Sequence, residues 1–219
     1  MGGTPITIRW LKDPTVQEIN RVIFILDAAF EDDDLFTTML HGGDKALVHL
    51  RFETFVHAAA IGGQIEVATL GPQVEDIVGV AVWYGPGQSS SATEQQREVG
   101  VRRFLAALPE DLKKWWLEHL VPVLEQLNKE CLDPGFSLSQ WYLPFFAVHL
   151  QHHRKGIAKA LMASAEDKAK ADGGSIVLET STDVDVVIYT RLGFEVKGKA
   201  KLSRAGYGEC QVHQMVKTP

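Results

Sequence analysis

The segment from Ala147 to Leu161, AVHLQHHRKGIAKAL, combines basic side chains with one glycine at the point where a strand pattern changes into a helix pattern. The first turn of a helix presents unpaired N–H groups and a partial positive charge, so it can bind phosphate groups through the backbone alone. Gly156 has no Cβ to obstruct a close approach, and Ala158 has a small side chain. Arg154 and Lys155 add positive charge. The segment therefore predicts an anion-binding helix N-terminus.

A metal site is the alternative reading of the same segment, because it contains His149, His152 and His153. Neighbouring residues of an extended chain point to opposite sides, so these imidazoles are not expected to face one centre. The two cysteines, Cys131 and Cys210, form no C-x-x-C pair. We therefore expect no metal, no disulfide framework and reduced thiols.

The composition excludes several classes of partner. The chain has 219 residues, with 22 Lys and Arg against 28 Asp and Glu, and its formal net charge is −6. Since a phosphate backbone would meet a protein of like charge, we expect no nucleic acid as a partner. The sequence lacks an apolar run of about 18 residues and a signal-peptide pattern, so we expect no membrane and a cytoplasmic protein.

The elements that must position the motif alternate along the chain, which predicts a single α/β domain over residues 1–219. Helices are predicted after Asp13 as N-cap and Pro14, and then over 45–60, within 92–130, from the glycine motif to Gly173, and over 184–192. Pro122 is expected to interrupt the helical segment 92–130. Strands are predicted at 6–11, 64–70, 76–84, 141–150, 175–180, 194–200 and 207–217.

Residues 147–162, AVHLQHHRKGIAKALM, resemble the acetyl-CoA signature of the GNAT N-acetyltransferase superfamily. That signature is Gln or Arg, two residues, Gly, one residue, and then Gly or Ala. The corresponding positions are His153, Gly156 and Ala158, so that histidine replaces the usual Gln or Arg while its backbone amide remains available.

A second segment, TDVDVVIYTRLGFEV at 182–196, is similar to the part of this family in which a helix carries a tyrosine shortly before Leu-Gly-Phe. Tyr189 matches that tyrosine, and Thr182 stands where many members have Asn. The resemblance covers about residues 141–196.

The resemblance implies a mixed, mostly antiparallel central sheet with helices on both faces, an α/β (α+β) fold in which strands four and five splay apart. It implies acetyl-CoA as cosubstrate, with the pantetheine arm between those strands, and no metal. Backbone groups of strand four would bind the arm, and amides of the helix N-terminus would hold the pyrophosphate. The coenzyme-binding residues expected from it are Phe146, Ala147, Val148, His153, Arg154, Lys155, Gly156, Ile157, Ala158 and Lys159.

The activity implied is transfer of an acetyl group, by direct attack, to a primary amine of a small molecule or peptide. By family position Tyr189 is the expected general acid for the leaving thiolate. Glu179 is a candidate general base, with pairing to a surface lysine as its alternative. The backbone N–H of Val148 is expected to stabilise negative charge on the thioester oxygen.

Several alternatives stay open at this point. The acidic run EDDD at 31–34 either attracts a cationic amine or is a solvated stretch in which Asp34 caps the next helix. The helical insertion at about 92–130 is expected to form a wall of the acceptor site or a dimer contact, so monomer and homodimer both remain. A catalytically degenerate acyl-CoA-binding or regulatory domain is the second function, which His153 and Thr182 favour and Tyr189 opposes.

Overall fold

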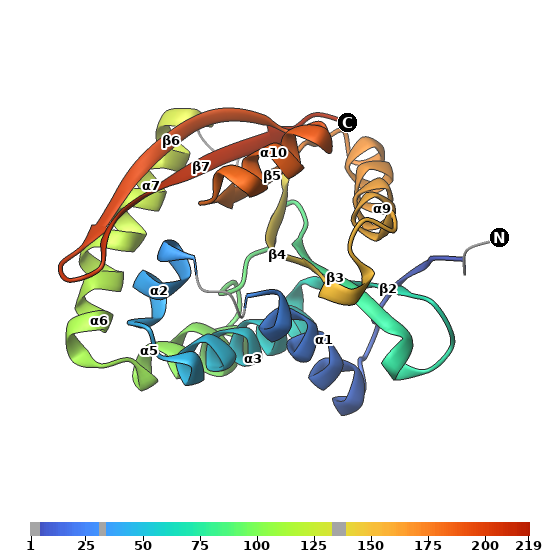
Figure 1. Ribbon diagram of the computed structural model, residues 1–219, viewed down its shortest axis with the longest axis horizontal. Helices are drawn as coiled ribbons and strands as arrows, with labels where there is room; N and C mark the ends of the chain where they lie inside the picture. Colours follow the sequence, from blue (N-terminus) through green and yellow to red (C-terminus); the bar gives the residue numbers. More distant parts are fainter. Residues whose placement is uncertain (1–4, 31–33, 133–138) are drawn as a thin grey trace.

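The computed structural model describes residues 5–30, 34–132 and 139–219, and its described strands form one sheet (Figure 1). The strand order is β1-β2-β3-β4-β5-β7-β6, and β4–β5 is the parallel pair among antiparallel neighbours. The strands are β1 (Thr7–Trp10), β2 (Gln64–Thr69), β3 (Ile77–Tyr84), β4 (Trp141–Val148), β5 (Ile176–Thr180), β6 (Glu195–Arg204) and β7 (Gly208–Lys217). The mixed, mostly antiparallel sheet is as expected.

Helices cover both faces of the middle of this sheet. Every residue of strand β3 is buried, and all of its side chains are aliphatic or aromatic; Gly79 carries none. Val80 and Val82 pack with α1 (Val16–Ala29) and α3 (Lys45–Gly62), whereas Ala81 and Trp83 pack with α9 (Ile157–Ala171). The continuous apolar run of β3 is thus explained by two covered faces.

The first helix begins at a different residue from the one predicted. Thr15, and not Asp13, is the N-cap of α1: its side chain accepts from the backbone N–H of Glu18 at 3.2 Å. The Glu18 carboxylate in turn accepts from the Thr15 backbone N–H at 2.9 Å. This reciprocal capping box satisfies two N–H groups at once, so it prevails over a single aspartate.

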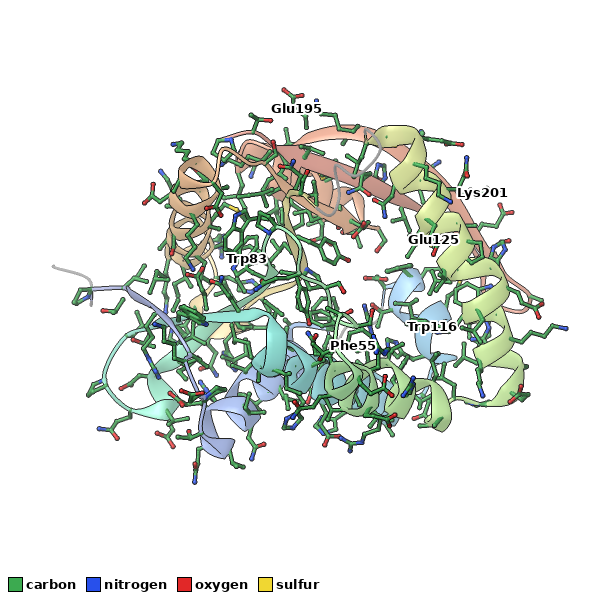
Figure 2. All side chains as sticks on the ribbon, turned by 180° about the vertical axis from the view of Figure 1, so that it is seen from behind. Phe55, Trp83, Trp116, Glu125, Glu195 and Lys201 are labelled. Carbon is green, nitrogen blue, oxygen red and sulfur yellow. The ribbon has the colours of Figure 1, made fainter. Side chains whose placement is uncertain are left out.

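The predicted helical insertion is a series of short helices. They are α4 (Glu94–Arg97), η2 (Glu98–Arg102), α5 (Arg103–Ala107), α6 (Glu110–Trp115), η3 (Trp116–Leu120) and α7 (Val121–Cys131). Pro122 does not break the last of these: a π-helical turn, η3, precedes it, and the helix continues. The wider turn accommodates a residue without an N–H, which is why the expected interruption is absent. Trp116 is buried, whereas Glu125 on α7 is exposed; both are labelled in Figure 2.

Strands β4 and β5 diverge, as expected. Their parallel pairing is limited to Trp141 with Ile176 and Tyr142 with Val177. The register of β4 against β3 shifts by one residue between Tyr142 and Phe145, which marks a β-bulge around Pro144. A bulge bends its strand and increases its twist, so β4 turns away from β5 just beyond the paired residues.

The short helix α2 (Leu35–His41) is held by side chains from much later in the chain. The Trp116 indole donates to the Leu40 carbonyl at 2.8 Å, Arg204 donates to Met39 at 3.1 Å, and Tyr207 donates to Gly42 at 2.9 Å. Carbonyl groups at a helix C-terminus have no N–H partner within the helix, and these three side chains donate hydrogen bonds to them. The β6–β7 hairpin, which arches across the molecule in Figure 1, thereby fixes α2.

No helix in the described residues is both long and apolar enough to cross a bilayer.

Candidate functional site

Two cavities meet where β4 and β5 diverge. The smaller, of about 430 Å³, lies over the N-terminus of α9, and the larger, of about 730 Å³, lies between β4, β5, α2 and α3. We call them the motif cavity and the central cavity. The residues that line both are Phe146, Ala147, Val148, His153, Asp185 and Tyr189. One continuous site therefore runs through the gap between the strands.

The glycine motif forms the floor of the motif cavity. Gly156 is the N-cap of α9 with a φ of +83°, a conformation that favours glycine. A Cβ built at this position would meet no protein atom within 4 Å, so its outer side is open. The cavity is lined by the expected residues from Phe146 to Lys159 with one exception: Lys155 is exposed and outside the lining. A helix N-terminus beside open space is the arrangement on which the predicted anion site depends.

The register of β4 decides which backbone groups face the gap. The His149 backbone N–H donates to the Val78 carbonyl, so residues 149 and 147 direct their backbone groups to β3. Phe146 and Val148, which alternate with them, direct theirs toward β5. The expectation that all three residues offer backbone hydrogen bonds to the pantetheine arm is therefore wrong for Ala147. Ala147 lines both cavities, but its N–H and C=O point to β3.

The departure at His153 has a structural explanation. Its Nε2 lies 2.8 Å from the Val148 carbonyl oxygen, and since a carbonyl only accepts, the ring nitrogen is the donor. The side chain thus ties the glycine loop to the end of β4. It also occupies the Val148 carbonyl, leaving the Val148 N–H as the free backbone group of that residue.

Thr182, the other departure, caps a helix. It is the N-cap of α10 (Asp183–Arg191), where its hydroxyl accepts from the Asp185 backbone N–H at 3.0 Å and donates to the Asp185 carboxylate at 2.7 Å. The cap orients α10, which carries Tyr189 about two turns further on.

Tyr189 stands at the junction of the two cavities. Its ring lies 6.2 Å from that of Phe146 on β4 and 5.5 Å from that of Phe194. Burial raises the pKa of Tyr189 above its usual value, and the nearby Asp185 carboxylate raises it further. The phenol is therefore a neutral hydrogen-bond donor at the gap.

Glu179 lines the central cavity from β5. Burial raises the pKa of its carboxyl group, and hydrogen bonds from Tyr142 and Asn128 oppose that shift. Its alternative, pairing with a surface lysine, is not observed among the described residues. Glu179 and Tyr189 thus line the same cavity.

Two residues of the central cavity had no signal in the sequence. Arg51 lies in the middle of α3, whose pattern is apolar on several sides, and Tyr142 looked like an ordinary strand residue.

Asp34 caps α2 by accepting from the Thr37 N–H at 2.8 Å and also lines this cavity. Residues 31–33 of the acidic run lie outside the described residues. From the helical insertion, Leu124 reaches the lining.

Comparison with known proteins agrees with this geometry. Residues 135–218 match the model of the acetyltransferase (GNAT) domain. An uncharacterised N-acetyltransferase of Schizosaccharomyces pombe is 26% identical over 180 residues, which are 80% of this chain and 70% of the relative. Residues 135–218 therefore carry the likeness of this chain to the GNAT acetyltransferases.

Solved structures of acetyltransferases have a similar fold. The histone acetyltransferase HPA2 and related acetyltransferase from Corynebacterium glutamicum has a TM-score of 0.61 at 21% identity, covering 98% of this chain and 96% of its own. The mosquito arylalkylamine N-acetyltransferase like 5b has a TM-score of 0.63 at 18% identity, covering 97% and 99%. The gap between β4 and β5 and the glycine loop before α9 lie at the positions that the resemblance to this family implies.

Among the described residues no group of three His, Cys, Asp or Glu side chains is placed to hold a metal ion.

Proposed function

We propose that this GNAT protein transfers an acetyl group from acetyl-CoA, by direct attack, to a primary amine of a small molecule or peptide. The observation that carries the proposal is the junction of the two cavities, where Tyr189 and the free backbone edge of β4 stand between the glycine loop and Glu179. The glycine loop offers N–H groups beside open space, and the gap exposes unpaired strand groups. Both features suit an extended ligand with a pyrophosphate.

Acetyl-CoA supplies the thioester carbonyl carbon to which the amine adds. On this proposal the motif cavity holds the pyrophosphate at the N–H groups around Gly156, and Phe146 offers its backbone groups to the pantetheine arm. The Val148 N–H faces the gap and donates to the carbonyl oxygen as negative charge develops there. The His153 bond to the Val148 carbonyl holds that N–H in place.

Glu179 is the proposed general base. An alkylamine has a pKa of about 10, so only about one molecule in a thousand is neutral at pH 7 and a base must accept a proton. The raised pKa of Glu179 brings its proton affinity closer to that of an amine. Tyr142, which donates to the same carboxylate, holds its orientation.

Tyr189 is the proposed acid. A thiol has a pKa of about 8.5 and a free phenol about 10, so full proton transfer to the departing thiolate is uphill by about 2 kcal/mol even without the raised pKa. Tyr189 therefore stabilises the thiolate by donating a hydrogen bond, and the proton follows as the product leaves.

Release of free thiol from acetyl-CoA tests the proposal. The assay uses a panel of polyamines, arylalkylamines, amino sugars, amino acids and peptides. We expect thiol release that depends on the amine and equals the acetylated product formed. Saturable binding of acetyl-CoA without thiol release for any amine would contradict the proposal and favour the catalytically degenerate domain.

A further inference from the structure

Arg51 presents a guanidinium group to the central cavity from the middle of α3. Aromatic rings flank it: its Cζ lies 5.2 Å from the ring centroid of Phe145 and 6.0 Å from that of Phe52. Such flanking rings hold a guanidinium in one orientation while leaving its N–H edge free.

This guanidinium has no hydrogen bond and no ion pair with any residue in the described ranges 5–30, 34–132 and 139–219. Burial lowers the pKa of Arg51 to about 10, so the group is still charged at pH 7. A charge removed from bulk water normally has a partner, because desolvation is costly without one. The geometry thus leaves a charged donor facing the cavity.

The charges around the cavity are separated into two regions. Glu179 and Asp185 lie on the β5 and α10 side. Arg51 lies on the α3 side, where the Asp34 carboxylate attracts it electrostatically but is used to cap α2 at the Thr37 N–H. An occupant with an amine at one end and a single negative charge at the other would match both regions.

We infer that the acetyl acceptor is an amine that also carries a carboxylate, and that Arg51 binds this carboxylate through two parallel N–H bonds. The inference rests on the proposed function and names its substrate class. A planar carboxylate matches the guanidinium fork. A doubly charged phosphate would meet the carboxylates of Asp34 and Glu179 in the same cavity, so the carboxylate is the assigned group.

Amino acids and their amides are matched pairs for the test, since the amide removes the charge and keeps the size. Acetyl transfer to each pair is measured by thiol release, with kcat and KM determined separately. We expect kcat/KM to be about 10- to 100-fold higher for the acid, mainly through KM, as for a charge-assisted hydrogen-bond pair. The amine of the amide is less basic, so a larger fraction of it is neutral and nucleophilic at pH 7. Intrinsic reactivity therefore favours the amide, and a preference for the acid must come from binding.

The variant Arg51→Met should abolish the preference by lowering kcat/KM for the acid to about that of the amide, and Arg51→Lys should restore part of the preference. Arg103→Met is the matched control: Arg103 is an exposed cation paired with Glu53 at 3.0 Å and lies outside the cavity. It should keep the full preference. Acetyl-CoA binding by each variant checks folding, because Arg51 does not line the motif cavity.

The outcomes separate the two proposals. Absence of thiol release with every amine contradicts the proposed function. Transfer with equal kcat/KM for acid and amide in the unaltered protein, which needs no variant, overturns the role of Arg51. Two further results would overturn the role of Arg51. One is a larger ratio of kcat/KM for phosphoethanolamine over ethanolamine than for the amino acid over its amide. The other is a preference for the acid that persists in Arg51→Met.

Discussion

The Nε2 atom of His153 donates a hydrogen bond to the carbonyl oxygen of Val148 over 2.8 Å. One contact thereby joins the loop before α9 to the last residue of β4, on either side of the motif cavity. The residue that departs from the family signature is thus a link between the two parts of the proposed coenzyme site.

Replacing His153 by Ala should weaken acetyl-CoA binding about 3- to 10-fold, because a hydrogen bond worth about 1 kcal/mol no longer orders the loop. His153→Gln, whose amide N–H can donate to the same carbonyl, should recover most of the affinity. Calorimetric titration with acetyl-CoA measures both. Equal affinity for His153→Ala and the unaltered protein would show that the link has no part in binding.

Replacing Tyr189 by Phe should lower kcat at least about 100-fold and leave acetyl-CoA affinity nearly intact, since the ring contacts with Phe146 and Phe194 do not need the hydroxyl. The measurement is steady-state kinetics beside coenzyme titration. Undiminished kcat would remove Tyr189 from the reaction. Tyr207→Phe, which removes a phenol outside the lining of both cavities, serves as a comparison.

Replacing Glu179 by Gln should remove the acidic limb of the pH–rate profile. Burial raises the pKa of Glu179 above its usual 4.5, so the base is lost by protonation as the pH falls through that raised value. The unaltered enzyme should lose activity below it, and the Gln variant should be slow, by about 10²- to 10⁴-fold, at every pH. An acidic limb that persists in the variant would assign it to another group.

Replacing Gly156 by Ala should affect coenzyme binding more than folding. Its φ of +83° makes alanine strained by about 1 to 2 kcal/mol, yet a Cβ there meets no protein atom within 4 Å. Gly87 has a φ of +77° and equally open surroundings. Gly87→Ala should therefore cost similar stability in thermal unfolding while keeping acetyl-CoA affinity, and equal loss of affinity in both variants would refute the assigned contact.

The sequence predicted what is local to the chain and failed where distant segments meet. The glycine loop and the helix with Tyr189 follow from neighbouring residues, and both lie where expected. Pro144 inside a strand pattern was an available signal for the bulge, since proline in a paired strand cannot donate. Arg51 gave no such signal, because a single cation in an apolar helix is ordinarily a residue whose head reaches solvent.

Two of the donors to α2 come from late in the chain, which affects the order in which the chain folds. Tyr207 bonds to Gly42 across 165 residues of sequence, and Arg204 reaches Met39 over the same separation. During synthesis the Met39 and Gly42 carbonyl groups lack these two donors until the segment with Arg204 and Tyr207 has emerged from the ribosome. The wall of the central cavity is therefore completed late in synthesis, after the segments of the glycine loop and α10 are already available to fold.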